Sequence, residues 1–296
     1  MTNKNYKENP INFIKDYRIG FNSQNKTIEL LPLLSFEESI INVFHLNYHS
    51  IIMKSRQMHL TSLLTTYAAW YMIFQENKNI SVVVPNSKMG SNFLRKVKII
   101  LDNYFKNTEK YPTDNINKIK LANGSSLEFI TNASGMVSKR IDFLIIDEAS
   151  FVKNLKGLWF SAAMSLKSNE GKSILCSSVN YSDDYFMQLF DEAKRKGNGF
   201  IPIIKKWNEN PYYTTCYYNE FLQLHGKDLT LQELDCIPQR RTDKEKFEKN
   251  NIITFRVDSW MEKEINKRLI QKSEELKENY SISTYIRELI FKDLKQ

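Results

Sequence analysis

Apolar and polar positions follow two different periods along this chain between about residue 30 and residue 205. Short apolar runs predict strands at Ser50–Met53, Ile80–Val84, Lys118–Leu121, Ser126–Ile130, Ile141–Ile146 and Lys172–Ser177. Apolar residues at helical spacing predict helices at Leu60–Phe74, Phe93–Phe105 and Trp159–Leu166. Asn123-Gly124 is typical of the tight turn of a hairpin. Strands that alternate with helices predict an α/β fold, a mainly parallel sheet with helices on both faces.

The pattern changes near Pro238, where the alternation ends. Residues 239–251 are rich in charge and contain one large apolar residue, so they are expected to form a linker. Residues 252–296 then predict a strand at Ile252–Val257, followed by helices at about Ser259–Lys277 and Ser283–Lys295. The sequence thus predicts two domains, residues 1–238 and 252–296, joined by that linker.

Composition narrows the classes of function. The 296 residues include 42 Lys and Arg against 34 Asp and Glu, a formal net charge of +8 that suits a polyanionic partner or a lysine-rich surface. No apolar run approaches the length of a membrane helix, and the first residues lack the apolar core of an export signal. Three scattered cysteines indicate a reducing compartment rather than a disulfide framework, and four histidines form no metal-ligand pattern with them.

The octet FLIIDEAS, residues 143–150, is the most informative segment. Its four apolar residues predict a buried strand, and Asp147 and Glu148 follow where the strand leaves the sheet. The carboxyl ends of parallel strands hold the ligand sites of such folds. There one carboxylate can hold Mg²⁺ while the other polarises an attacking water. An exposed acidic turn after a buried strand is the alternative.

A basic loop, KSRQMHLTS, joins another predicted strand to a helix at residues 54–62. A strand, loop and helix in this order can bind phosphate with backbone N–H groups and the helix N-terminus. The common pattern G-x4-G-K-[ST] is not met, since Leu60 stands where that lysine would be and His59 where its second glycine would be. Lys54 nevertheless heads the loop, and Thr61 and Ser62 follow at positions suited to Mg²⁺. An ordinary strand–helix turn is the alternative.

Small polar residues, Ser177, Ser178 and Asn180, follow the strand Lys172–Ser177. They could sense a γ-phosphate beside the Asp-Glu strand, although Ser and Asn are also common in turns.

These three segments occur in the order and spacing of one family, so the chain resembles the ATPase domain of the large terminase subunit, the DNA-packaging motor of tailed bacteriophages. KSRQM-x-x-TS is similar to its Walker A in the form whose lysine leads the loop, FLIIDEAS to its Walker B, and SSVN to its coupling motif. Further segments fit the family's framework: Leu34–Asn42, with Glu37 where a glutamine is usual, Asn123-Gly124-Ser125, Trp207-Asn208-x-Asn210-Pro211 and Glu233-x-Asp235-Cys236. The resemblance covers about residues 10–240.

The resemblance implies a P-loop ATPase that uses ATP and Mg²⁺ to act on double-stranded DNA. It assigns ATP binding to Lys54, Ser55, Arg56, Gln57, Met58, His59, Leu60, Thr61 and Ser62. Thr61 and Asp147 would hold Mg²⁺, Glu148 would orient the attacking water, and Arg56 could sense the nucleotide. Ser177, Ser178 and Asn180 would couple hydrolysis to DNA.

Two departures from the family bear on activity. His59 replaces a loop glycine, and a left-handed histidine would cost roughly 1–3 kcal/mol, so turnover is expected to be slow or absent. After Cys236 nothing resembles the family's nuclease domain, so no nuclease activity is expected. The alternative function is a non-catalytic DNA-binding or assembly protein on a degenerate ATPase scaffold. Implied partners are a small terminase, a portal or a separate nuclease subunit, in the cytoplasm of an infected bacterium.

Residues 252–296 resemble a ribbon–helix–helix DNA-binding module. In its strand Phe255 and Val257 alternate with Thr254 and Arg256, so one face packs while the other is polar. The resemblance implies that two copies pair through this strand as a homodimer. Thr254 and Arg256 would then contact the DNA groove and Ser283, a candidate helix N-cap, would lie at backbone phosphate. A helical tail that covers the ATPase domain is the alternative.

Overall fold

The structure is a computed structural model that describes residues 5–22, 27–47, 49–106, 111, 113–115, 117–136, 139–241 and 268. Contacts between Cα atoms divide the chain into a unit of Met1–Arg241 and a unit of Thr242–Gln296. All described residues except Arg268 belong to the first unit. The predicted C-terminal module, including Thr254, Arg256 and Ser283, lies outside the described residues.

The first unit is an α/β fold, which confirms the predicted class. Its strands are β1 (Ile19–Asn22), β2 (Thr27–Leu30), β3 (His49–Lys54), β4 (Asn79–Val83), β5 (Thr113–Asp114), β6 (Lys118–Lys120), β7 (Ser126–Ile130), β8 (Phe143–Asp147), β9 (Lys172–Ser177) and β10 (Ile201–Lys205). Its α-helices are α1 (Pro10–Tyr17), α2 (Ser35–Leu46), α3 (Leu60–Phe74), α4 (Ser87–Phe105), α5 (Leu155–Ser168), α6 (Tyr185–Lys194), α7 (Thr215–His225) and α8 (Lys227–Glu233).

Eight strands form the main sheet, in the order β10-β3-β9-β8-β4-β7-β6-β5. The six strands from β10 to β7 run parallel, whereas β6 and β5 are antiparallel to their neighbours. The strand β9 therefore lies between β3 and β8, although it follows both in the sequence. A small hairpin of β1 and β2 stands apart from this sheet.

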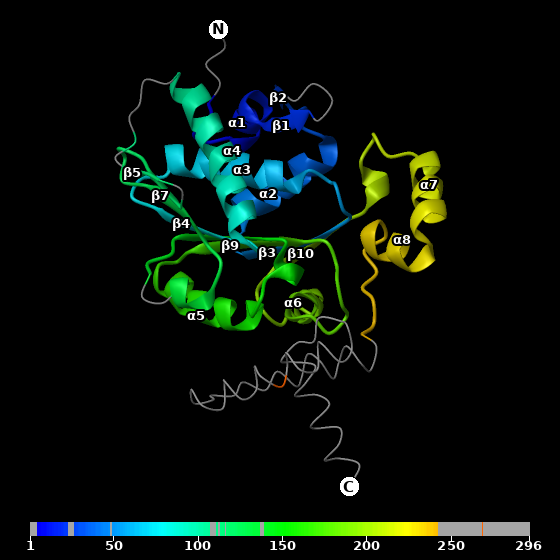
Figure 1. The fold of residues 1–296 in the computed structure, drawn as a ribbon. Helices are drawn as coiled ribbons and strands as arrows, with labels where there is room; N and C mark the ends of the chain where they lie inside the picture. The colour runs from blue at the N-terminus through cyan, green and yellow to red at the C-terminus, as the bar shows by residue number, and fades with distance from the viewer. Residues whose placement is uncertain are drawn as a thin grey trace. The chain divides into compact units, whose positions relative to one another are not determined.

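Helices cover both faces of the sheet, as the apolar strands require. Figure 1 shows α1 to α4 on one face and α5 and α6 on the other. Every residue of β8 is buried, which explains its unbroken apolar run. One core cluster joins the strands to α1, α2, α3 and α4, and a second joins them to α5 and α6. The helices α7 and α8 follow the edge strand β10 and lie beside the sheet in Figure 1.

Two predicted helices begin earlier than expected, for the same reason. The helix α4 begins at Ser87 rather than Phe93, and α5 begins at Leu155 rather than Trp159. Each is capped by the side chain of an asparagine, Asn86 or Asn154, which accepts a hydrogen bond from a backbone N–H in the first turn. Caps stabilise a first turn that carries few apolar residues, so apolar spacing alone places the start too late.

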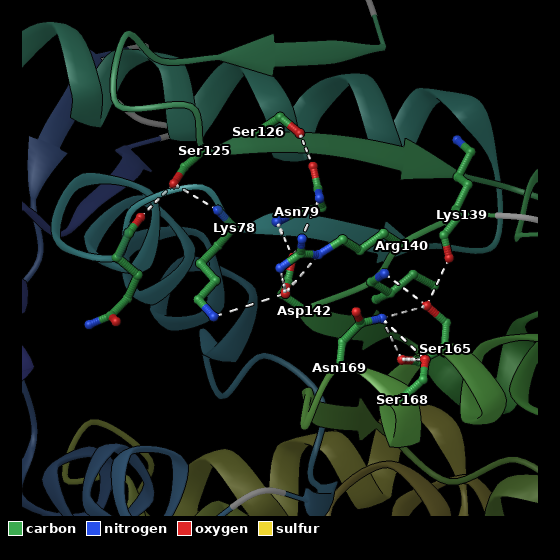
Figure 2. Close-up of polar contacts among 12 residues, drawn as sticks. Lys78, Asn79, Ser125, Ser126, Lys139, Arg140, Asp142, Ser165, Ser168 and Asn169 are labelled. Carbon is green, nitrogen blue, oxygen red and sulfur yellow. Dashed lines mark hydrogen bonds and ion pairs between the residues drawn. The ribbon is translucent and has the colours of Figure 1, made fainter.

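A polar network fixes the amino ends of the central strands, opposite the edge where Asp147 emerges (Figure 2). The buried carboxylate of Asp142 accepts hydrogen bonds from the backbone N–H of Asn79 at 2.9 Å and from the guanidinium of Arg140 at 3.0 Å. Ser165 of α5 accepts from the backbone N–H of Ile141 at 2.9 Å. These bonds join β4, α5 and the start of β8. They leave the other edge of the sheet to polar groups with a different role.

Candidate active site

Three neighbouring strands bring the predicted site residues to one edge of the sheet. In the sheet register Met53 of β3 lies opposite Ser177 of β9, and Asp147 of β8 lies opposite Cys176. Lys54, Ser177 and Asp147 therefore end adjacent parallel strands at the same level, although they lie far apart in the sequence. This edge is the usual ligand position in such sheets.

The carboxylate of Asp147 is paired with a hydroxyl from the start of α3. Thr61 Oγ1 donates a hydrogen bond to Asp147 Oδ2 at 2.7 Å, and Asp147 is 1% exposed. Burial, together with the charge of Glu148, raises the pKa of Asp147 above its usual range. A hydroxyl and a buried carboxylate are the hard oxygen ligands that Mg²⁺ accepts beside phosphate and water. The residues present thus fit the ion that the sequence implies.

The side chains of Lys54 and Glu148 form an ion pair across the site. Lys54 Nζ donates to Glu148 Oε1 at 2.8 Å, and Lys54 is only 4% exposed. Burial acts to lower the pKa of Lys54, but the charges of Glu148 and other nearby groups outweigh it, so the pKa is raised. The other carboxylate oxygen of Glu148 accepts from the backbone N–H and hydroxyl of Ser178, both at 3.4 Å. Glu148 thus contacts the ends of β3 and β9 at once.

The loop between β3 and α3 has an unusual backbone. Gln57 and His59 both have positive φ, 63° and 55°, so a histidine does occupy a left-handed position here. The carbonyl of His59 begins α3 by accepting from the backbone N–H of Ser62 at 3.0 Å. Such a conformation costs of order 1–3 kcal/mol, and strain of this kind clusters at ligand sites. Glu148 is also left-handed, with φ 54°.

Four side chains of the predicted ATP-binding segment serve the fold instead of facing Asp147 and Glu148. Met58 and Leu60 are buried in the core cluster. Ser55 Oγ donates to the carbonyl of Leu234, and Ser62 Oγ donates to the carbonyl of Ile19. Thr61 alone of the two predicted hydroxyls therefore contacts the acidic strand. The remaining contribution of these four residues is their backbone.

Arg56 points to the helices that follow β10. Its backbone N–H donates to the carbonyl of Glu233 at 2.8 Å, and its Nε donates to the carboxylate of the same residue. Tyr213 adds a second contact, its hydroxyl donating to the carbonyl of Gln57 at 2.9 Å. The segment Glu233-x-Asp235-Cys236 thus lies against the basic loop. A role for Arg56 in sensing nucleotide stays a prediction, since its side chain is 53% exposed and already paired.

A buried ion pair that the sequence did not predict supports the same loop. Arg18 and Glu37 are 2% and 0% exposed, and two hydrogen bonds of 2.5 and 2.6 Å join them side by side. Arg18 also donates to the carbonyl of Pro32 at 3.0 Å and of His59 at 3.4 Å. The glutamate noted where a glutamine is usual is therefore occupied by an internal partner.

The predicted coupling residues lie beside the acidic turn. Ser177 Oγ accepts from the backbone N–H of Ser150 at 3.0 Å, and Ser178 reaches Glu148 as described. The carbonyl of Asn180 accepts from the backbone N–H of Gln239. Two of the three residues thus contact the turn that carries Glu148, and Asn180 contacts the chain that leaves the unit.

Two negative findings concern the described part of the chain alone. No helix there is long and apolar enough to cross a membrane. It also holds no group of three or more His, Cys, Asp or Glu side chains placed to bind a metal ion.

No family model matches the sequence, but the fold has clear neighbours among solved structures. One is the ATPase domain of the large terminase of Thermus phage P74-26, with a TM-score of 0.54, 14% identity, and coverage of 64% of this chain and 88% of that chain. Another is the large terminase of bacteriophage HK97, with a TM-score of 0.55, 12% identity, and coverage of 82% and 52%. The third is the large terminase of a thermophilic bacteriophage in complex with ADP, with a TM-score of 0.53, 9% identity, and coverage of 66% and 49%.

The matched region thus spans most of the isolated ATPase domain and about half of the other two chains. At these identities the similarity concerns the fold. The architecture of this chain is that of the ATPase domain of phage large terminases.

Proposed function

We propose that this chain is a Mg²⁺-dependent ATPase of the terminase type that acts on double-stranded DNA during packaging. The observation that carries the proposal is the convergence of Lys54, Thr61, Asp147 and Glu148 at the carboxyl edge of three parallel strands. The fold of phage terminase ATPase domains supports it, as does the ADP bound to one of those neighbours.

Each residue has a definite task in such a reaction. Phosphoryl transfer to water depends mainly on positioning and on neutralising charge. Lys54 would leave Glu148 and bind phosphate oxygens, which frees the carboxylate of Glu148 to orient water. Thr61 and Asp147 would hold Mg²⁺, whose chemistry is to neutralise phosphate charge. Ser178 would then report any shift of Glu148 to β9.

An ATPase assay with and without double-stranded DNA tests the proposal. Glu148→Gln should keep nucleotide binding and abolish turnover, because the amide cannot accept a proton from water. Glu192→Gln, at an exposed position of α6, is the matched control and should turn over ATP like the wild type. Turnover that survives Glu148→Gln would exclude the assigned role. Plasmid incubated with the protein and Mg²⁺ or Mn²⁺ checks the separate expectation that DNA is not cut.

The left-handed His59 favours a second candidate, a non-catalytic assembly protein on the same fold. Nucleotide binding without turnover, with or without DNA, would support this candidate. A nucleotide affinity that is undetectable in the wild type would contradict the ATPase proposal outright.

DNA binding and dimerisation through residues 252–296 are proposed from the sequence alone. The full chain should bind duplex DNA without ATP, and Arg256→Ala should weaken that binding by about 1–3 kcal/mol if the side chain contacts a base. Phe255→Asp should abolish the dimer in analytical ultracentrifugation. A full chain that stays monomeric at micromolar concentration would instead favour the helical-tail alternative.

A further inference from the structure

The outer face of α5 carries two large apolar side chains that the described residues leave in water. Phe160 is 61% exposed and Met164 is 75% exposed. They lie four residues apart, so they are neighbours on one side of the helix. The opposite side of α5 packs into the second core cluster through Leu158, Ala162 and other apolar residues. The exposed pair is therefore extra to what the fold of the described unit needs.

Lysines flank this apolar pair at both ends. Lys156 precedes Phe160 by one turn, Lys167 follows Met164 by three residues, and Lys153 stands just before the helix; all three are exposed. None of the three lysines forms an ion pair with any other described residue. The sequence from Ala149 to Asn169 contains no Asp or Glu at all. The face is thus apolar in the middle and uniformly positive around it.

We propose that this α5 face, Lys153, Lys156, Phe160, Met164 and Lys167, is a docking site for an acidic amphipathic helix of a partner protein. Such a helix would set apolar residues spaced by three and four positions against Phe160 and Met164. Its Glu or Asp side chains would meet the lysines, which favours this partner and disfavours basic ones. The inference is independent of the ATPase proposal.

Other occupants fit the face less well. A second copy would set lysines against lysines, which opposes association. Residues 242–296 of this chain hold 12 Lys and Arg against 11 Asp and Glu, so they are not acidic as a whole. Duplex DNA would satisfy the lysines but would leave Phe160 and Met164 in water. The acidic helix is the occupant that uses both features.

Fluorescence anisotropy on the full chain tests the proposal with two labelled peptides. The probes are a synthetic amphipathic helix of Leu and Glu, about five turns long, and its counterpart of Leu and Lys. The Leu-Glu peptide should bind at least tenfold more tightly than the Leu-Lys peptide. Phe160→Ser with Met164→Ser should weaken that binding at least tenfold while the melting temperature stays unchanged, because both side chains are exposed.

Charge reversal separates this face from the general positive charge of the protein. Lys156→Glu with Lys167→Glu should reverse the preference in favour of the Leu-Lys peptide. Lys120→Glu with Lys227→Glu makes the same change of charge at exposed sites on β6 and α8 and should alter binding less than twofold.

Three results would overturn the proposal. The first is equal binding of the two peptides, or none, as expected if another part of the chain covers the face. The second is equal loss in the α5 and control charge variants, which indicates non-specific attraction. The third is competition by duplex DNA that is lost together with Lys156 and Lys167, which would assign the face to nucleic acid.

Discussion

Replacing Arg18 with methionine should lower the free energy of unfolding by about 3–5 kcal/mol, the usual cost of removing one partner of a buried ion pair. Glu37 is fully buried, and two of its hydrogen bonds come from Arg18. Without the guanidinium its carboxylate keeps only the backbone N–H of Leu34, at 2.9 Å. The carbonyl of Pro32 loses a donor as well, which adds to the cost.

The double variant Arg18→Met with Glu37→Leu separates the pair from its burial. Apolar replacement of both partners is often neutral or stabilising, so the double variant should lose at most about 2 kcal/mol. The coupling energy between the two sites should therefore exceed roughly 2 kcal/mol, far above the value for an exposed pair. Arg18→Met should also weaken nucleotide binding, because Arg18 donates to the carbonyl of the left-handed His59.

Urea unfolding followed by tryptophan fluorescence and circular dichroism gives these free energies. Glu37→Gln keeps the shape of the side chain but not its charge, so its cost should fall between those of the single and double apolar variants. A loss below about 1 kcal/mol in Arg18→Met would refute the reasoning, since it would mean that Glu37 finds water or another donor. Simple addition of the two single losses would refute it equally.

Three further outcomes are expected. Lys54→Ala should weaken nucleotide binding in isothermal titration calorimetry, and an unchanged affinity would remove Lys54 from the site. His59→Gly should raise the ATPase rate by releasing a strained position at φ 55°; a lower rate would show that the imidazole itself contributes. Burial lowers the pKa of Lys172 from 10.5 to about 8, so its ionisation opposes folding below pH 8 and that penalty fades as pH rises. Between about pH 8 and pH 9.5 the wild type should gain about 1–2 kcal/mol of unfolding free energy that Lys172→Met lacks, and equal gains would contradict this.

The elements that sequence predicted best are those whose own residues decide their structure. The helix Leu60–Phe74 and the strand Lys172–Ser177 were placed with their observed bounds, because the apolar pattern of each begins and ends with the element. The strand Ile201–Lys205 was not among those predicted. It lies at the edge of the sheet with Ile201 and Ile204 exposed, so its pattern lacks the uniform burial of the central strands.

The candidate site divides in the same way. The carboxylates of Asp147 and Glu148 and the hydroxyl of Thr61 could be read from short segments, because strand ends meet at one edge of a parallel sheet. The pairs Arg18–Glu37 and Arg56–Glu233 join residues 19 and 177 positions apart. No periodicity links such charges, since their partner is set by how the loops and helices pack. The segment containing Glu233 was noted, but nothing in it indicated that it would contact Arg56.

The resting arrangement of Lys54 limits how the site can work. Its ammonium group is almost fully buried, and its charge there depends on a nearby anion. In the described structure Glu148 supplies that anion. A phosphate group bound by the loop could supply it instead, and only then would the carboxylate of Glu148 be free to act on water. Binding of nucleotide and release of the catalytic carboxylate are therefore one exchange of partners at Lys54. Because Ser178 contacts the same carboxylate, the end of β9 must respond to that exchange.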